Sequence, residues 1–102
     1  MDTEAALRAL AHPGRRHVLQ LVSGTARPSG ELAEACGWTR PATSQHLKVL
    51  RDAGLIEVRK AGNRRLYRAR EEGLAQLRAF LDDFWAARLA TLGERVAEGR
   101  RE

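Results

Sequence analysis

The chain has few cysteines, few aromatic residues and no long apolar stretch. It contains 102 residues and one cysteine, which excludes a secreted scaffold held by intramolecular disulfides. Aromatic side chains make up only 5%, so the core must be built mostly from Leu, Val and Ala. No apolar run approaches the ~18 residues that cross a bilayer, and the first residues lack the pattern of a signal peptide. We therefore expect a cytoplasmic protein with no membrane partner.

Arginine dominates the charge of the chain. Lys and Arg total 18 against 13 Asp and Glu, a net charge of +5, and all but Lys48 and Lys60 are Arg. With 43% apolar and 30% charged residues, the composition is that of one globular domain. A net basic domain favours an anionic partner, and nucleic acid is the first candidate.

The N-terminal part predicts two helices. Asp2 or Thr3 can cap a helix that runs through Ala11, where His12-Pro13-Gly14 breaks the pattern. Pro13 suits the first turn of a second helix, which extends to about Val22. Arg15 and Arg16 are expected to be solvated, with DNA backbone contact as the alternative. Residues 23–28 are rich in turn formers and predict a loop.

A helix-turn-helix is predicted next, at about residues 29–54. Ser29 is the expected N-cap of a short helix over 30–35, and Gly37 supplies the positive φ of a tight turn at 36–38. Thr39 is expected to cap a second helix with Pro41 in its first turn, and Gly54 to end it in the left-handed conformation.

The remaining sequence predicts a hairpin and a long helix. Residues 56–60 and 65–70 are short extended runs around a turn at 61–64 that contains Gly62 and Asn63. From Glu71 the apolar residues are spaced by three and four as far as Val96. We expect a wing at about 55–70, a dimerisation helix at about 71–98, and a frayed tail at 99–102. Residues 1–98 then form a single domain.

This order of four helices, a β-hairpin and a last helix predicts a mainly α fold with a small β-hairpin, the winged helix-turn-helix. In such proteins the second helix of the motif lies in the major groove with its N-terminal residues at base edges. If Leu47 and Leu50 face the core, the outward side chains can bond bases or phosphates. The predicted contacts of this helix are Thr39, Arg40, Ser44, Gln45, His46 and Lys48.

The positive charge is concentrated in the same segment. Residues 40–70 hold nine basic and two acidic residues, a net charge of +7, whereas the rest of the chain holds nine basic and eleven acidic residues, a net charge of −2. Wing arginines would lie along phosphates or in the minor groove. The predicted wing contacts are Arg59, Lys60, Asn63, Arg64, Arg65 and Tyr67.

Three residues leave alternatives open. Tyr67 either contacts a phosphate through its hydroxyl or packs its ring under the wing. Trp38 is expected to fill the core between the two helices, with base stacking as the alternative. Cys36 is expected to be a small buried hydrophobe, with a redox-sensing thiol as the alternative.

The last helix carries a wide apolar stripe from Leu74 to Val96, more than one small domain can cover. An exposed apolar stripe usually marks an interface, so we interpret it as a dimer seam rather than as core alone. No Ser-His-Asp arrangement and no Gly-rich phosphate loop occurs, and no enzymatic activity or cofactor is expected.

Several strings in this chain resemble those of a known family. They are Ala9-Leu10-Ala11-His12-Pro13 with Arg16, Val18 and Leu19; Glu31-Leu32-Ala33; residues 41–51, Pro-Ala-Thr-Ser-Gln-His-Leu-Lys-Val-Leu-Arg; Ala53-Gly54-Leu55-Ile56; and Arg59, Gly62, Arg64 and Tyr67 in the wing. Over about residues 5–90 the chain is similar to the ArsR/SmtB family of bacterial winged-helix repressors.

The resemblance implies a homodimer joined by the first and last helices, an inverted-repeat operator in a promoter, and repression of transcription. The implied interface residues are Leu7, Leu10, Leu77, Leu81, Phe84, Trp85, Arg88 and Leu92. A dimer would hold its two recognition helices about one DNA turn apart, roughly 34–36 Å.

Metal-sensing members of that family use a Cys-x-Cys pair near the third helix, or Asp-x-His with a later His on the last helix. Here Cys36 stands alone, and nothing from Leu81 onward is histidine. We therefore expect no metal site, because such a site needs several donors together. A metal- or thiol-responsive repressor and a protein–protein interaction module of the same fold are the alternatives, and an inducer is left open.

Overall fold

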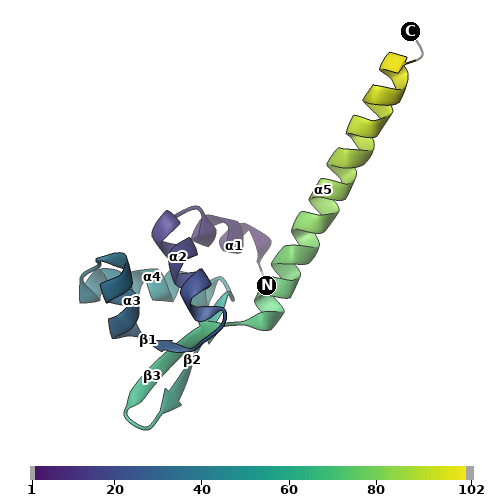
Figure 1. Cartoon of the computed structure of the whole chain (residues 1–102). Coiled ribbons are helices and arrows are strands. Elements are labelled where there is room, and N and C mark those ends of the chain that lie inside the picture. The colour runs from purple at the N-terminus through teal and green to yellow at the C-terminus, as the bar shows by residue number, and fades with distance from the viewer. Residues whose placement is uncertain (1, 101–102) are drawn as a thin grey trace.

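A computed structural model describes residues 2–100, with side chains through residue 93. The body contains the helices α1 (Thr3–Leu10), α2 (Pro13–Val22), α3 (Ser29–Cys36) and α4 (Arg40–Asp52). A sheet of β1 (Arg27–Pro28), β2 (Ile56–Ala61) and β3 (Arg64–Ala69) lies at one edge, and α5 (Glu71–Arg100) follows. Figure 1 shows α5 leaving the body on the side opposite α3, which accounts for the extents of 68 × 25 × 21 Å.

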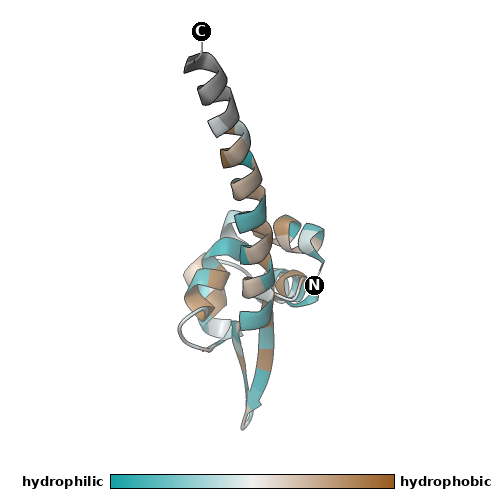
Figure 2. Cartoon of the chain, turned by 90° about the vertical axis from the view of Figure 1, so that its right-hand side faces the viewer, coloured by the Kyte–Doolittle hydropathy of each residue, from teal (hydrophilic) through white to brown (hydrophobic). Residues whose placement is uncertain are grey.

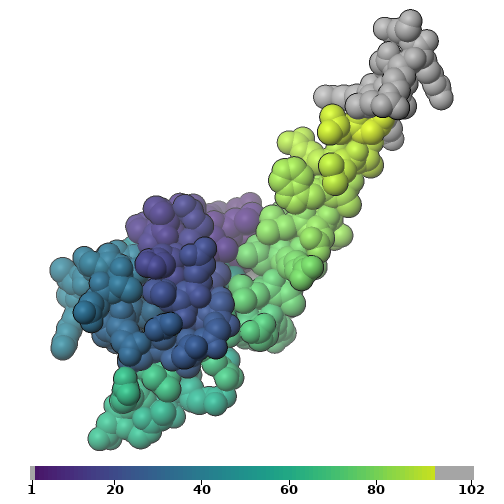
Figure 3. Space-filling model, viewed as in Figure 1, coloured from purple at the N-terminus to yellow at the C-terminus, as the bar shows by residue number. Residues whose placement is uncertain are grey.

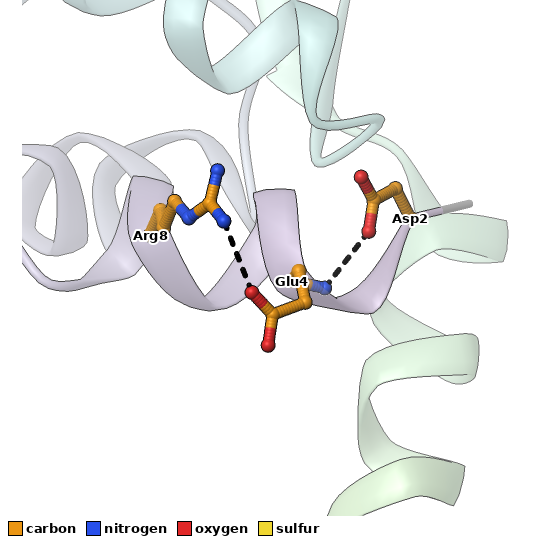
Figure 4. A network of polar contacts seen from close by, with 3 residues as sticks. All are labelled: Asp2, Glu4 and Arg8. Atoms are coloured by element: carbon orange, nitrogen blue, oxygen red, sulfur yellow. Dashed lines mark hydrogen bonds and ion pairs between the residues drawn. The ribbon is translucent and has the colours of Figure 1, made fainter.

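The first two helices begin at side-chain caps, of which the cap by Asp2 was predicted and the cap by His12 was not. Asp2 Oδ1 accepts a hydrogen bond of 3.0 Å from the Glu4 amide, and Arg8 bonds the Glu4 carboxylate at 3.1 Å one turn later (Figure 4). His12 Nδ1 accepts from the Gly14 amide at 3.0 Å, with Pro13 in the first turn of α2. These acceptors satisfy amides that have no partner inside the helix.

Two glycines end α3 and α4 in the left-handed conformation. Gly37 has φ 67° and Gly54 has φ 76°. Beyond them, the Trp38 amide bonds the Ala33 carbonyl at 3.0 Å and the Leu55 amide bonds the Leu50 carbonyl at 3.0 Å. This six-to-one bond is the Schellman motif, which turns the chain back onto the helix it has just left. The predicted ends at both glycines are confirmed.

The sheet has one strand that the sequence did not predict. Its order is β1-β3-β2, all antiparallel, and the hairpin pairs Ile56 with Ala69 and Ala61 with Arg64 around the Gly62-Asn63 turn. In the predicted loop, β1 pairs Arg27 with Tyr67 and Pro28 with Leu66. Pro28 therefore occupies the N-cap position of α3 with no side-chain cap, and the prediction that Ser29 is the N-cap is wrong.

The core lies where the four body helices meet the sheet. Its largest fully buried side chains are Leu32, Leu50, Leu55, Val18 and Val22. Each contributes roughly 1.5–3 kcal/mol by leaving water. Within the residues whose side chains are described, α5 joins this core through its first turns, by Leu77 and the partly buried Leu74.

The helix α5 extends two residues past its predicted end. It continues to Arg100, whereas the sequence predicted an end near 98 and a frayed tail from 99. Residues 101 and 102 of that predicted tail lie outside the described residues. In Figure 3 the yellow-green part of α5 stands clear of the body.

Candidate nucleic-acid interface

The start of α4 is fixed by Thr39. Its Oγ1 accepts a hydrogen bond of 3.2 Å from the Ala42 amide, and its carbonyl accepts one of 2.8 Å from the Thr43 hydroxyl. Thr43 is only 2% exposed, and the bond to the Thr39 carbonyl gives its buried hydroxyl a partner within the same helix turn. Thr39, predicted as a DNA contact, is exposed and acts as the helix cap.

The buried side of α4 decides which side chains face solvent. Thr43, Leu47 and Leu50 are buried at the spacing of one helix face. The opposite side chains are exposed: Arg40, Pro41, Ser44, Gln45 and Lys48. Lys48 makes an exposed ion pair of 2.7 Å with Asp52. Arg40 and Gln45 are therefore both free to contact bases on this side of α4. An arginine can bind a guanine edge, and a glutamine an adenine edge, through two hydrogen bonds.

His46 differs from the other predicted contacts on α4. Its ring is half-buried and stacks on Trp38 with centroids 4.0 Å apart, and its Nδ1 lies 3.3 Å from Arg15 Nη1. Burial lowers the pKa of His46, with smaller contributions from His12 and Arg15. The His46 ring is thus held by contacts inside the protein. It is less accessible to a phosphate than the exposed side chains of Arg40, Gln45 and Lys48.

The wing presents its cations without acidic neighbours. Arg59, Lys60, Asn63, Arg64 and Arg65 are all exposed around the turn, where Gly62 has φ 65°. Nearer the body, Arg68 bonds Glu57 at 2.6 Å, and Arg70 bonds Glu72 at 3.1 Å. Counting only the part of the chain that the structure describes, six of the nine basic residues of 40–70 have no ion-pair partner.

Tyr67 belongs to the core and not to the exposed part of the wing. Its side chain is 8% exposed, on β3 between Arg27 of β1 and Val58 of β2. Of the two alternatives, packing under the wing is the one that the structure shows for the ring. The ring is covered here because strand β1, which was not predicted, pairs beside it. A phosphate contact by the Tyr67 hydroxyl stays a prediction.

A hollow between α3 and α4 was missed by sequence reasoning. It is lined by Ser29, Gly30 and Ala33 from α3 and by Arg40, Thr43 and Ser44 from α4. The uncapped first amides of α3 and the Arg40 side chain therefore border one space, and both attract anions. The sequence signal for this hollow is Pro28, which cannot cap α3 with its side chain. That signal becomes readable only when β1 is known to place Pro28 at the N-cap.

Arg15 and Arg16 are not simply solvated. Arg15 Nε and Nη2 donate to the carbonyls of Ala9 and Arg8 at 2.6 and 3.2 Å, and Arg16 Nη1 donates to that of Leu10 at 2.8 Å. Both side chains bond the last carbonyls of α1, where the Arg8 carbonyl also accepts from the Ala11 amide at 3.2 Å. Arg15 is half-buried, so the expectation that it is solvated is wrong, whereas Arg16 is exposed as expected.

A second exposed surface, the α5 apolar face, lies away from the basic one. It consists of Leu7 of α1 and Phe80, Leu81, Phe84, Trp85, Leu89 and Leu92 of α5, with Trp85 58% and Leu92 57% exposed. Figure 2 shows brown, apolar segments continuing up α5 beyond the body. Arg88 lies among them, with its guanidinium 5.3 Å from the centre of the Phe84 ring. An exposed apolar surface of this extent usually marks an interface.

Two of the residues predicted for the dimer seam serve the protomer itself. Leu77 is 7% exposed and belongs to the core, and Leu10 is half-buried against it. The stripe pattern of the last helix could not separate Leu77 from Leu81 and Phe84, because the body covers the first turns of α5 and leaves residues 78–93 exposed.

Cys36 is half-buried at the end of α3. Its Sγ lies 4.0 Å from the Gly14 carbonyl oxygen and 4.0 Å from His17 Nδ1, and burial raises the pKa of the thiol. Among the described residues, no three His, Cys, Asp or Glu side chains gather where they could hold a metal ion. None of the described helices is long and apolar enough to span a membrane.

Known proteins are similar to this chain in sequence. A family model described as a helix-turn-helix domain matches residues 10–59. The HTH-type transcriptional regulator Rv2034 of Mycobacterium tuberculosis is 44% identical over 86 residues, 84% of this chain and 80% of that protein. The arsenical resistance operon repressor of Staphylococcus xylosus is 33% identical over 76 residues, 74% of this chain and 73% of that protein.

A solved structure extends the comparison to the fold. The homodimeric winged helix-turn-helix DNA-binding domain Mb0332 from Mycobacterium bovis superposes with a TM-score of 0.66 at 30% identity, over 81% of this chain and 77% of that one. Its description as a possible ArsR-family regulator agrees with the motifs quoted above. The chain therefore belongs to the ArsR/SmtB family of winged helix-turn-helix transcriptional regulators.

Proposed function

We propose that this protein is a homodimeric repressor that binds an inverted-repeat operator in a promoter. The observation that carries the proposal is the placement of charge: six basic side chains without ion-pair partners, within the described residues, lie on α4 and the wing. Cations of this kind neutralise phosphates and release counterions, and this supplies much of the affinity for DNA.

The roles within this surface divide by chemistry. Arg40, Ser44, Gln45 and Lys48 enter the major groove on α4 and read base edges. Arg59, Lys60, Asn63, Arg64 and Arg65 follow the backbone or the minor groove from the wing. The uncapped start of α3 adds a backbone contact to a phosphate.

Dimerisation through the α5 apolar face would set the positions of the two recognition helices on DNA. Two copies related by a two-fold axis would present two recognition helices to successive major grooves, roughly 34–36 Å apart. The homodimeric Mycobacterium bovis domain supports this arrangement, and the Staphylococcus xylosus repressor supports repression. We propose that the protein acts in the cytoplasm without a metal, a cofactor or an enzymatic activity. Burial raises the pKa of the Cys36 thiol, and this disfavours the thiolate that would bind a metal or react.

The test is binding to the DNA upstream of the protein's own gene. Fluorescence anisotropy would compare this fragment with a shuffled fragment of equal composition across a range of salt concentrations. We expect tight binding to the upstream fragment, a steep fall of affinity with salt, and much weaker binding to the shuffled one. Equal affinity for both fragments would contradict an operator-binding function, and no binding to either would favour a protein–protein module.

A further inference from the structure

Four side chains gather where α1, α2 and α4 meet. His12 precedes α2, Arg15 lies in its first turns, Trp38 lies in the turn before α4, and His46 lies on α4. The His46 ring stacks on Trp38 at 4.0 Å, and the centroids of His12 and His46 are 4.6 Å apart. The cluster therefore joins the recognition helix to the N-terminal helices.

Arg15 is the side chain that crosses this junction. Its guanidinium donates to the carbonyls of Ala9 and Arg8 at 2.6 and 3.2 Å, and its Nη1 lies 3.3 Å from His46 Nδ1. A guanidinium only donates hydrogen bonds, so Nδ1 of His46 must accept. The contact therefore requires a neutral imidazole whose proton is on Nε2.

We propose that Arg15 and His46 are positioning residues for operator recognition, which together hold α4 at a fixed place against the end of α1. This rests on the proposed function. Because α1 packs on α5 and carries part of the α5 apolar face, a recognition helix tied to α1 is tied to the dimer. The link would thereby set the spacing between the two recognition helices, and with it the half-site spacing that the dimer accepts.

The link is sensitive to protonation of His46. The ionisable groups that act on this ring come from the α2 side, His12 and Arg15, while α1 contributes carbonyls bound by Arg15 and the α3–α4 turn contributes the non-ionisable Trp38. Burial lowers the pKa of His46, and the neighbouring His12 and Arg15 lower it further. A proton on Nδ1 would point a donor at the Arg15 donor and add a second cation.

The sign of the effect follows from linkage. A histidine whose pKa is lower in the folded state stabilises that state fully above its ordinary value of 6.5, and the contribution is lost as the pH falls from there through the folded-state value. Plain electrostatics acts in the opposite direction, because protonated histidines strengthen binding to phosphates. A loss of operator affinity in acid would therefore be specific to the link.

The test compares operator affinity at about pH 7.5 and about pH 5.5 in wild type, His46→Asn and His17→Asn, because histidine titrates in this range. Asn Oδ1 can accept from Arg15 as Nδ1 does, but it cannot be protonated. We expect wild type to lose about three- to tenfold more affinity in acid than His46→Asn, since one excluded proton gives at most about tenfold per pH unit. His17 is exposed and outside the cluster, so His17→Asn should behave as wild type.

A second pair of variants tests the spacing. Arg15→Met removes the link, whereas Arg16→Met removes only a bond to the Leu10 carbonyl and does not touch His46. Operators whose half-sites are moved one base pair apart should be rejected by wild type and Arg16→Met, and tolerated by Arg15→Met. Thermal unfolding of all variants separates loss of the fold from loss of positioning.

A readout without DNA completes the design. Nitrogen-15 NMR of the free protein should show an unprotonated Nδ1 on His46 at neutral pH, and this signal should shift in Arg15→Met and not in Arg16→Met. Identical pH profiles for wild type and His46→Asn, together with unchanged spacing preference in Arg15→Met, would overturn the link. A wild type that shows the NMR signature and binds no operator would overturn the proposed function instead.

Discussion

Gly14 has no room for a side chain. A Cβ built on it would collide with the Trp38 ring and lie 3.1 Å from the His12 ring. Trp38 therefore packs across the first turn of α2, on the same side as the junction of α1 and α4. The absence of a side chain at Gly14 therefore lets the start of α2 lie close to Trp38, in the turn before α4.

Replacing Gly14 by alanine is expected to destabilise the fold by about 1–3 kcal/mol, because the indole must move. Gly30→Ala is the matched control: no atom lies within 4 Å of its Cβ, and alanine suits a helix better. Urea unfolding at a single protein concentration measures both. Equal stability of the two variants would show that Trp38 does not occupy this space.

At this scale the sequence predicted some roles and missed others, for physical reasons. Thr39 and Gly37 were predicted correctly, because their roles depend on bonds within a few residues. The roles of Arg15 and Tyr67 were not, because each depends on a partner distant in sequence, His46 for the first and β1 for the second. Local patterns carry no information on such partners.

Among the elements, we propose different tasks for α4 and for the wing. The helix α4 presents Arg40 and Gln45 on a rigid, capped first half, whereas the wing presents its arginines around a turn. Base recognition needs fixed geometry, while phosphate contact needs mainly charge. The two elements should therefore respond differently to the loss of one side chain.

Gln45→Ala is expected to lower affinity for the best operator by about 1–3 kcal/mol and to relax preference at one base pair in each half-site. The amide can bond an adenine edge with two hydrogen bonds, and alanine can make neither. Anisotropy titrations against operators that carry each substitution measure the change. If affinity and preference both stayed at the wild-type values, the outward face assigned to α4 would be wrong.

Arg64→Ala is expected to weaken binding to all DNA sequences by a similar factor. It should reduce the slope of log affinity against log salt by about 1 for each Arg64 side chain, hence by about 2 for the dimer. Arg64 is exposed at the start of β3 and forms no ion pair within the described chain. Arg68→Ala is the matched control on the same strand, since Arg68 is already paired with Glu57. A change confined to one operator sequence would show that the wing reads bases.

Elements could be predicted where they are long and where cap or turn residues mark their ends. The four body helices and the hairpin were predicted because caps, Gly turns and periodic apolar residues mark them. The two-residue strand β1 was not, because a strand this short has no periodicity and forms only once β3 is beside it. Its presence also moved the cap of α3 from Ser29 to Pro28.

On the scale of the whole molecule, α5 separates two functions. Its first turns complete the core through Leu77, and its later turns carry an apolar face that the protomer leaves uncovered. The basic surface on α4 and the wing lies elsewhere in the fold, as Figure 1 shows. A substitution on the α5 apolar face can therefore disturb dimerisation without changing the basic side chains themselves.

Trp85→Glu is expected to shift the protein from dimer to monomer, because a carboxylate would be buried without a partner in the seam. Gln76→Glu adds the same charge to the same helix nine residues away, on the opposite side at about 100° per residue, and should remain dimeric. Sedimentation equilibrium measures the mass of each. A dimeric Trp85→Glu variant would mean that the α5 apolar face is not the seam.

The most direct test of the account is selection of binding sites from random DNA. Duplexes with a random stretch of about 30 base pairs, enough for two half-sites one helical turn apart, would be bound by the wild-type protein, recovered and sequenced. The account predicts enrichment of one inverted repeat with half-site centres about 10 base pairs apart, and loss of that enrichment in Trp85→Glu. Recovery of sequences indistinguishable from the starting pool would contradict it.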